Sequence, residues 1–96
     1  MMIKVIAKFN FKVGNIDKVK TLCAELIDAT RKEVGCIQYD LLQSDKDENV
    51  MVFVENWESQ KALDVHSASE HFTRIVPQLA GLCAELPSVE TFKQII

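Results

Sequence analysis

The sequence has no long apolar run. Its uninterrupted hydrophobic stretches are only a few residues long, whereas roughly 20 apolar residues are needed to cross a bilayer as a helix. The first residues, Met1-Met2-Ile3-Lys4, lead directly into an alternating pattern, unlike a secretory signal peptide. We therefore expect a cytoplasmic protein with a single domain over residues 1–96, a length within the usual range for one domain.

Positive charge is also scarce. The 11 Lys and Arg residues are scattered and outnumbered by 14 Asp and Glu, which gives a net charge of −3 and a pI near 5.3. Nucleic acids and anionic membranes both require a clustered cationic surface, so we expect neither as a partner. The acidic loop Asp45–Glu48 lacks the glycine and the distal glutamate of a calcium-binding loop, and we interpret it as a solvated turn.

Cysteines are few and widely spaced. Cys23, Cys36 and Cys83 are odd in number and contain no C-x-x-C pair. This spacing fits neither a disulfide framework nor a zinc cluster. We interpret the three cysteines as reduced core residues.

The first half of the chain alternates between two hydrophobic periods. Residues 2–13 place apolar side chains at every second position and predict a half-buried strand ended by Gly14. Asn15 is expected to cap a helix whose apolar residues recur at helical spacing, and Gly35 is expected to stop that helix. Residues 36–44 predict a second strand.

A polar loop then connects this second strand to a third, Val50 to Trp57, as an antiparallel hairpin. Ser59 can cap a short helix that ends near His66. The sequence Ser67-Ala68-Ser69-Glu70 is a capping-box pattern that opens another helix.

The apolar stripe of that last helix runs from Phe72 to Leu86. Pro77 is expected to kink the helix, with the Gly81 region helping it to bend. Residues 88–96 predict a final strand. The order strand, helix, strand, strand, helix pair, strand predicts a ferredoxin-like α+β sandwich, βαββαβ, with one antiparallel sheet covered by helices on one side.

One face of this sheet would remain uncovered. Val50, Val52 and Val54 lie on the face opposite Phe53 and Trp57, because side chains alternate along a strand. A wet row of valines would be a contiguous apolar patch. We therefore predict a homodimer packed through this sheet face, in which residues 92–96 reach over the partner.

The segment from Phe53 to Phe72 gathers the only tryptophan and both histidines. On one continuous helix, His66 and His71 would lie roughly 140° apart around the axis. The predicted helix break lets both rings turn toward one cavity. A carboxylate on an apolar strand face needs a partner or a task, and Glu55 shares such a face with its neighbours in the strand, Met51, Phe53 and Trp57.

These residues carry a family resemblance. The pattern E-x-W-E-S-x-x-x-L-x-x-H-x-x-x-x-H resembles the antibiotic-biosynthesis monooxygenase family, especially its small quinol monooxygenase-like members; it is formed by Glu55, Trp57, Glu58, Ser59, Leu63, His66 and His71. Ile3–Phe9 is similar to that family's first strand, and Glu33–Tyr39 to its helix-to-strand junction. The resemblance spans nearly the whole chain and implies a dimeric α+β barrel.

The resemblance also implies a cofactor-independent monooxygenase that oxidises a quinol- or anthrone-like aromatic with dioxygen. Such an enzyme removes a proton, and the substrate anion passes an electron to dioxygen without flavin or metal. It needs a base, donors to the oxyanion and an apolar enclosure. We expect His66 or His71 to be the base, with the other histidine and Glu55 orienting or stabilising the anion. The expected substrate-binding residues are Trp57, Phe53, Phe72 and Tyr39.

Structural roles stay open for each of these residues. Either histidine can serve a helix end, Trp57 and Tyr39 can be core residues, and Glu55 can pair with a lysine of the first strand. His66, His71 and Glu55 also form a two-histidine, one-carboxylate set. The resemblance implies no metal there, and we expect none.

Other functions of similar proteins are further alternatives. They are the isomerisation or degradation of a small signalling sugar, ligand sensing by a dimer without turnover, and haem binding or degradation. Haem is the least favoured, because the asparagine, tryptophan and histidine of the haem-degrading members align with Phe9, His66 and Val76.

Overall fold

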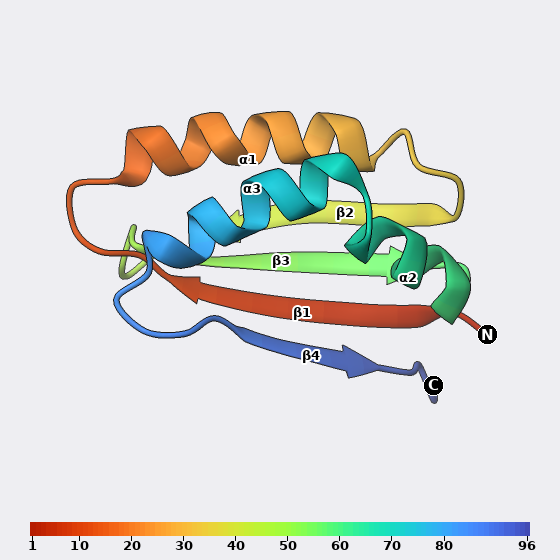
Figure 1. Cartoon of the computed structure of the whole chain (residues 1–96). Helices are drawn as coiled ribbons and strands as arrows, with labels where there is room; N and C mark the ends of the chain where they lie inside the picture. Colours follow the sequence, from red (N-terminus) through yellow and green to blue (C-terminus); the bar gives the residue numbers. More distant parts are fainter.

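Four strands and three helices follow one another along the chain in a computed structural model that describes residues 1–96 (Figure 1). They are β1 (Ile3–Asn10), α1 (Ile16–Thr30), β2 (Cys36–Gln43), β3 (Val50–Trp57), α2 (Gln60–Ser67), α3 (Glu70–Gly81) and β4 (Ser88–Phe92). The strands form one antiparallel sheet in the order β2-β3-β1-β4. This is the predicted ferredoxin-like α+β fold.

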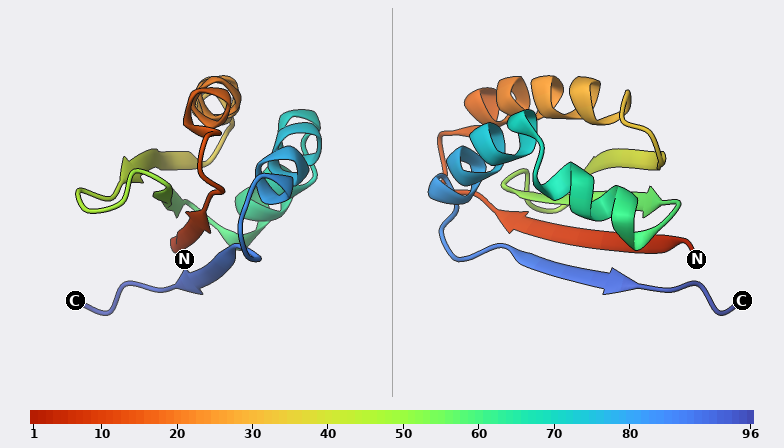
Figure 2. Two further views of the ribbon diagram at one scale, coloured as in Figure 1. Left: turned by 90° about the vertical axis from the view of Figure 1, so that its left-hand side faces the viewer. Right: turned by 45° about the vertical axis from the view of Figure 1, so that its right-hand side comes forward.

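All three helices lie on the same face of the sheet (Figures 1 and 2). Helices α1 and α3 pack side by side, and α2 lies near the end of the sheet where β1 begins (Figure 1). Side chains alternate regularly along β1 and β3, so that every second side chain of these two strands points toward the helices. The core is formed by these side chains and by the inner faces of α1 and α3; it includes Val5, Ala7, Phe9, Phe53, Trp57, Val19, Leu26, Ile75 and Leu79.

The opposite face of the sheet has no helix over it (Figure 2). Ile6, Leu42 and Phe92 are 43%, 55% and 41% exposed there. Val52 and Val54 are half-buried between neighbouring strands. The chain thus presents an apolar sheet face that it does not cover itself.

None of the three helices has the length and apolar composition that a bilayer crossing requires. The three cysteines are free, as expected, with Cys23 and Cys83 buried and Cys36 half-buried. Burial raises the pKa of the Cys23 thiol to about 12, so this side chain behaves as a small apolar core residue.

Two predicted boundaries in the first half were wrong. Strand β1 ends at Asn10 because Phe11 forms only an isolated bridge with Cys83. Helix α1 ends at Thr30, and Gly35 instead forms the positive-φ turn that leads into β2, at φ 88°. Several non-helical residues separate Thr30 from Gly35. The glycine therefore marks the turn after the helix and not the end of the helix itself.

The last helix and strand were predicted too long. Helix α3 continues through Pro77 but ends at Gly81. The backbone N–H of Lys12 donates to Leu82 O, and that of Ala84 donates to Asn10 O, so the chain after Gly81 pairs with the end of β1. Strand β4 ends at Phe92, opposite Lys4, because β1 has almost no residues left to pair beyond that point.

Candidate functional site

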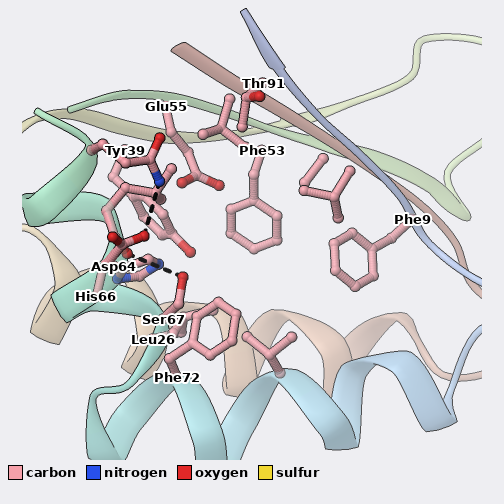
Figure 3. Close-up of a pocket in the computed structure, with 16 residues that line it drawn as sticks. Phe9, Leu26, Tyr39, Phe53, Glu55, Asp64, His66, Ser67, Phe72 and Thr91 are labelled. Atoms are coloured by element: carbon pink, nitrogen blue, oxygen red, sulfur yellow. Dashed lines mark hydrogen bonds between the residues drawn. The ribbon is translucent and has the colours of Figure 1, made fainter. Parts of the chain in front are cut away.

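A cavity of about 260 Å³ lies between the sheet and the helices (Figure 3). The aromatic rings of Phe9, Phe53 and Phe72 face it from both sides. Its other apolar lining comes from Val5, Ala7, Leu26, Tyr39, Leu63, Val76 and Val89. An enclosure of this kind suits a flat apolar ligand with a few polar groups.

The polar groups of the cavity form two clusters, and Thr91 of β4 adds a single exposed hydroxyl. Tyr39, Glu55 and His66 are buried and lie together at one end (Figure 3). Gln60, Asp64 and Ser67 are exposed and come from one face of α2, where Gln60 Nε2 donates to Asp64 Oδ1 at 2.9 Å. No lysine or arginine is among the lining residues. The cavity therefore holds two carboxyl groups and no cation.

Both histidines meet a third residue, Glu33, on the side of His66 away from the cavity. Glu33 Oε2 lies 2.7 Å from His66 Nδ1 and 2.8 Å from His71 Nε2. Glu33 and His71 do not line the cavity. An ionised carboxylate only accepts hydrogen bonds, so with Glu33 ionised each histidine donates one ring N–H. His66 then keeps its Nε2 lone pair free.

The break between α2 and α3 brings the two rings to one carboxylate. Helix α2 begins after Ser59, whose Oγ accepts from Ala62 N at 3.1 Å. Ser69 caps α3 by accepting from Phe72 N, and its hydroxyl donates to His66 O at 2.6 Å. The cap is Ser69 and not Ser67, which is the last residue of α2. Glu70 does not close a capping box, because Arg74 Nε donates to its carboxylate.

Gly35 holds the Glu33 turn against α2. A Cβ at Gly35 would lie 2.6 Å from Ala62 Cβ, closer than real Cβ contacts allow. Gly35 O also accepts from Glu58 N at 2.9 Å. A glycine at this position thus permits the approach that places Glu33 beside His66.

We expect Gly35→Ala to lower the free energy of unfolding by about 2–5 kcal/mol, from left-handed backbone strain together with overpacking against Ala62. Gly14 is the matched control, because it also has positive φ, at 94°, but a Cβ there meets nothing within 4 Å. Gly14→Ala should therefore cost only the backbone strain, about 1–2 kcal/mol. Urea unfolding measures both variants; equal losses would mean that the contact with Ala62 has no energetic role.

His66 lies in an aromatic cage. It is 1% exposed, and its ring centroid lies 4.5 Å from that of Trp57, 5.0 Å from Phe72 and 5.3 Å from Tyr39. Burial lowers the pKa of His66, while the hydrogen bond to Glu33 opposes this shift. The neutral imidazole is thus favoured, with Nε2 as the nitrogen that has no partner within the chain.

Glu55 is paired with Trp57. Its Oε1 accepts from Trp57 Nε1 at 2.9 Å, and no hydrogen bond joins it to either histidine. Burial raises the pKa of the Glu55 carboxyl to about 7, with the Trp57 bond acting in the opposite direction. Near neutral pH this carboxyl is present in both forms, so it can accept or donate a proton inside the cavity.

The raised pKa of Glu55 predicts a pH-dependent contribution to stability. The folded state holds this proton more tightly than the unfolded state, so stability should fall as pH rises from the ordinary value of 4.5 to about 7 and then stay level. The loss is roughly 3 kcal/mol by the linkage relation. Urea unfolding from pH 4 to 9 measures it as the difference between wild type and Glu55→Gln. Parallel curves would show that the pKa of Glu55 is the same in the folded and the unfolded chain.

Comparison with known proteins places this arrangement in a family. The model of the family described as antibiotic biosynthesis monooxygenase matches residues 2–78. The chain belongs to this family. A crystal structure titled antibiotic biosynthesis monooxygenase superposes with a TM-score of 0.94 and 39% identity, covering 98% of this chain and 99% of that one.

Two further relatives are the protein named putative monooxygenase Rv0793, of Mycobacterium tuberculosis, and protein sll1783 of Synechocystis sp., whose name gives no activity. Rv0793 of Mycobacterium tuberculosis is 34% identical over 80 residues, which are 83% of this chain and 78% of that protein; its solved structure superposes with a TM-score of 0.93 over 100% of this chain and 97% of that chain. Protein sll1783 of Synechocystis sp. is 26% identical over 91 residues, or 95% of this chain. The aligned part is only 62% of the length of sll1783.

The site residues predicted from the sequence lie in two regions of this antibiotic biosynthesis monooxygenase domain. The cavity is lined by Tyr39, Phe53, Glu55, His66 and Phe72. His71 and Trp57 lie outside it; Trp57 is completely buried and holds Glu55. Asn10, the last residue of β1, donates to Glu85 away from the cavity.

Glu33 was not identified as a site residue from the sequence. The only available signal was its place two residues before Gly35, in the segment that resembles the family's helix-to-strand junction. The sequence suggested a two-histidine, one-carboxylate set with Glu55 as the carboxylate. In the structure the carboxylate beside both histidines is Glu33. The ligand atoms of Glu33, His66 and His71 lie within 4.8 Å of one another, so these residues could hold a metal ion.

Proposed function

We propose that this protein oxidises an uncharged phenolic aromatic, a quinol or an anthrone, with dioxygen and without a cofactor. The observation that carries the proposal is His66, whose Nδ1 bonds to Glu33 while its ring lines an apolar cavity. Burial among aromatic rings keeps this imidazole neutral, and a neutral imidazole with a free Nε2 is a general base.

The reaction begins when His66 Nε2 takes a proton from the substrate. The Tyr39 hydroxyl and the protonated form of Glu55 donate hydrogen bonds to the resulting oxyanion. The pKa of Tyr39 is raised, chiefly by burial, so its phenol stays a donor. The anion passes an electron to dioxygen, and the two radicals combine at carbon. For an anthrone, one oxygen atom becomes the new carbonyl, and the other leaves as water with both methylene hydrogens.

The charge of the cavity favours this substrate class over a phosphorylated sugar. The lining has two carboxyl groups, Glu55 and Asp64, and no cation. A phosphate or carboxylate would lose its hydration there without a compensating partner, which costs several kcal/mol. The rings of Phe9, Phe53 and Phe72 provide apolar contact for an aromatic body instead.

A homodimer is the second part of the proposal. A second copy of the chain would cover the open sheet face that carries Ile6, Val52 and Val54. Burial of such a patch in a two-fold interface is the usual solution for an exposed apolar surface. Free cysteines are typical of a reducing compartment, so the proposal includes a cytoplasmic location.

Dioxygen uptake by purified, chelator-treated protein tests the proposed activity. The panel consists of naphthoquinols and anthrones, each with a carboxylated analogue, and every rate is corrected for autoxidation. Uptake should exceed autoxidation for uncharged substrates and be much weaker for carboxylated ones. Rates no faster than autoxidation across the panel would contradict the proposal, and would leave sugar processing or ligand sensing as the remaining functions.

A further inference from the structure

The Glu33 cluster, meaning Glu33, His66 and His71, forms a second polar site behind the cavity. The side chains of Glu33 and His71 are 13% and 17% exposed, whereas that of His66 is 2% exposed. The cluster can therefore be reached from the protein surface without passing through the cavity. His66 is the only member that belongs to both sites.

Hydrogen bonds within the cluster do not satisfy all of its polar atoms. Both histidines share Oε2 of Glu33. Oε1 of the same carboxylate is buried and has no hydrogen-bond partner. A buried, unpartnered carboxylate oxygen is costly and is usually satisfied by water or an ion. The lack of a partner for Oε1 does not depend on the positions of the histidines. It indicates that a further ligand lies beside Glu33.

The donor set and its spacing fit a zinc-like ion. Two imidazole nitrogens and one carboxylate oxygen are typical of zinc sites that keep a fourth position open. Ligand atoms around a tetrahedral ion with bonds of about 2.1 Å lie about 3.4 Å apart. The atoms of the cluster lie within 4.8 Å of one another, and its two hydrogen-bonded edges measure 2.7 and 2.8 Å. Side-chain movements of roughly 1 Å would therefore build the site.

We propose that Glu33, His66 and His71 bind a zinc-like divalent ion, and that this ion switches off His66 as a base. The regulatory part of this proposal rests on the proposed function, whereas the metal site does not. The ion binds Nδ1 of His66 and Nε2 of His71. Each neutral ring keeps one proton, which must move to the other nitrogen through exchange with water. His66 Nε2 then carries a hydrogen and faces the cavity as a donor.

This switch needs no change in the cavity lining. In the metal-free state, His66 donates from Nδ1 to Glu33 and accepts a substrate proton at Nε2. In the metal-bound state, the lone pair of Nδ1 is used by the ion, and Nε2 has no lone pair left for a proton. Aromatic ligands should still bind, because Phe53, Phe72 and the other apolar lining residues are unaffected.

Isothermal titration with Zn²⁺ tests the site without substrate. The protein is first stripped of metal with a chelator, and the chelator is then removed. Wild type should bind one ion per chain, and Mg²⁺, which prefers oxygen ligands, should give no heat. Glu33→Gln and His71→Ala should each weaken binding by at least roughly 10–100-fold. Cys36→Ser is the matched control, because this half-buried thiol is a soft alternative ligand close enough to Glu33 for the Glu33 charge to raise its pKa; its binding should equal that of wild type.

Absence of saturable binding would mean adventitious zinc only and would overturn the site. Binding in Glu33→Gln and His71→Ala that is as tight as in wild type would have the same meaning. Histidine ¹⁵N spectra of wild type give a second readout if a variant fails to fold. Zn²⁺ should move the His66 proton from Nδ1 to Nε2, and an unchanged tautomer would also overturn the site.

The switch and the proposed function fail in different ways. Zinc binding without any oxygenase activity would contradict the proposed function and retain the site. Oxygenase activity that persists at saturating Zn²⁺ would contradict the switch and retain the proposed function. Activity that falls with zinc occupancy in wild type and Cys36→Ser would support both.

Discussion

His66→Gln is expected to lower kcat for dioxygen uptake by about 10²–10⁴-fold, the usual contribution of a general base. Glutamine retains hydrogen-bonding capacity toward Glu33 but cannot take a proton from a phenol. Because the aromatic lining is retained, KM should change little. Initial rates of uptake, corrected for autoxidation, measure this effect, and circular dichroism checks that the variant is folded.

His71→Gln is the matched control for that substitution. His71 bonds to the same oxygen of Glu33 but does not line the cavity, so its loss should cost less than about 10-fold in kcat through poorer positioning of Glu33. Equal losses in both variants would mean that the two histidines act as a unit. An unchanged kcat in His66→Gln would exclude it as the base and leave Glu55, whose raised pKa of about 7 suits the same role.

The fold could be predicted from the sequence because local signals agree with one another. Alternating side chains set the strands, and Ser59 and the Ser67–Glu70 segment mark the helix break. The ends of elements were less predictable, because tertiary pairing decides them. β1 stops where Phe11 turns to Cys83, and α3 stops where the following residues bond back to β1.

The candidate site was only partly visible for a related reason. Glu55, His66 and Phe53 are close in sequence, and the strand and helix periods bring them to one cavity. Glu33 lies 33 residues before His66, and its position depends on the close approach of Gly35 to Ala62. A contact of this kind leaves no periodic pattern in the sequence. The role of Trp57 was hidden in the same way, since its indole holds Glu55 from within the core instead of facing the cavity.

The same alternation that fills the cavity side of the sheet leaves apolar residues on the other side. Val54 is half-buried on the open face, between Ile6 of β1 and Asp40 of β2. In a monomer a lysine at this position would reach water and lie opposite Asp40. In a sheet-to-sheet dimer the same ammonium group, with Asp40 beside it, would be removed from water against the partner.

Val54→Lys should therefore convert the proposed dimer to a folded monomer. Loss of hydration by this lysine in each subunit costs about 3 kcal/mol or more, which raises the dimer dissociation constant by at least ~100-fold. Sedimentation velocity over a range of protein concentrations measures it. Val13→Lys is the control, because Val13 is 85% exposed and lies outside the sheet, so its dimer should be unaffected. A wild-type monomer, or a Val54→Lys protein that dimerises as well as Val13→Lys, would show that something other than a second copy covers this face.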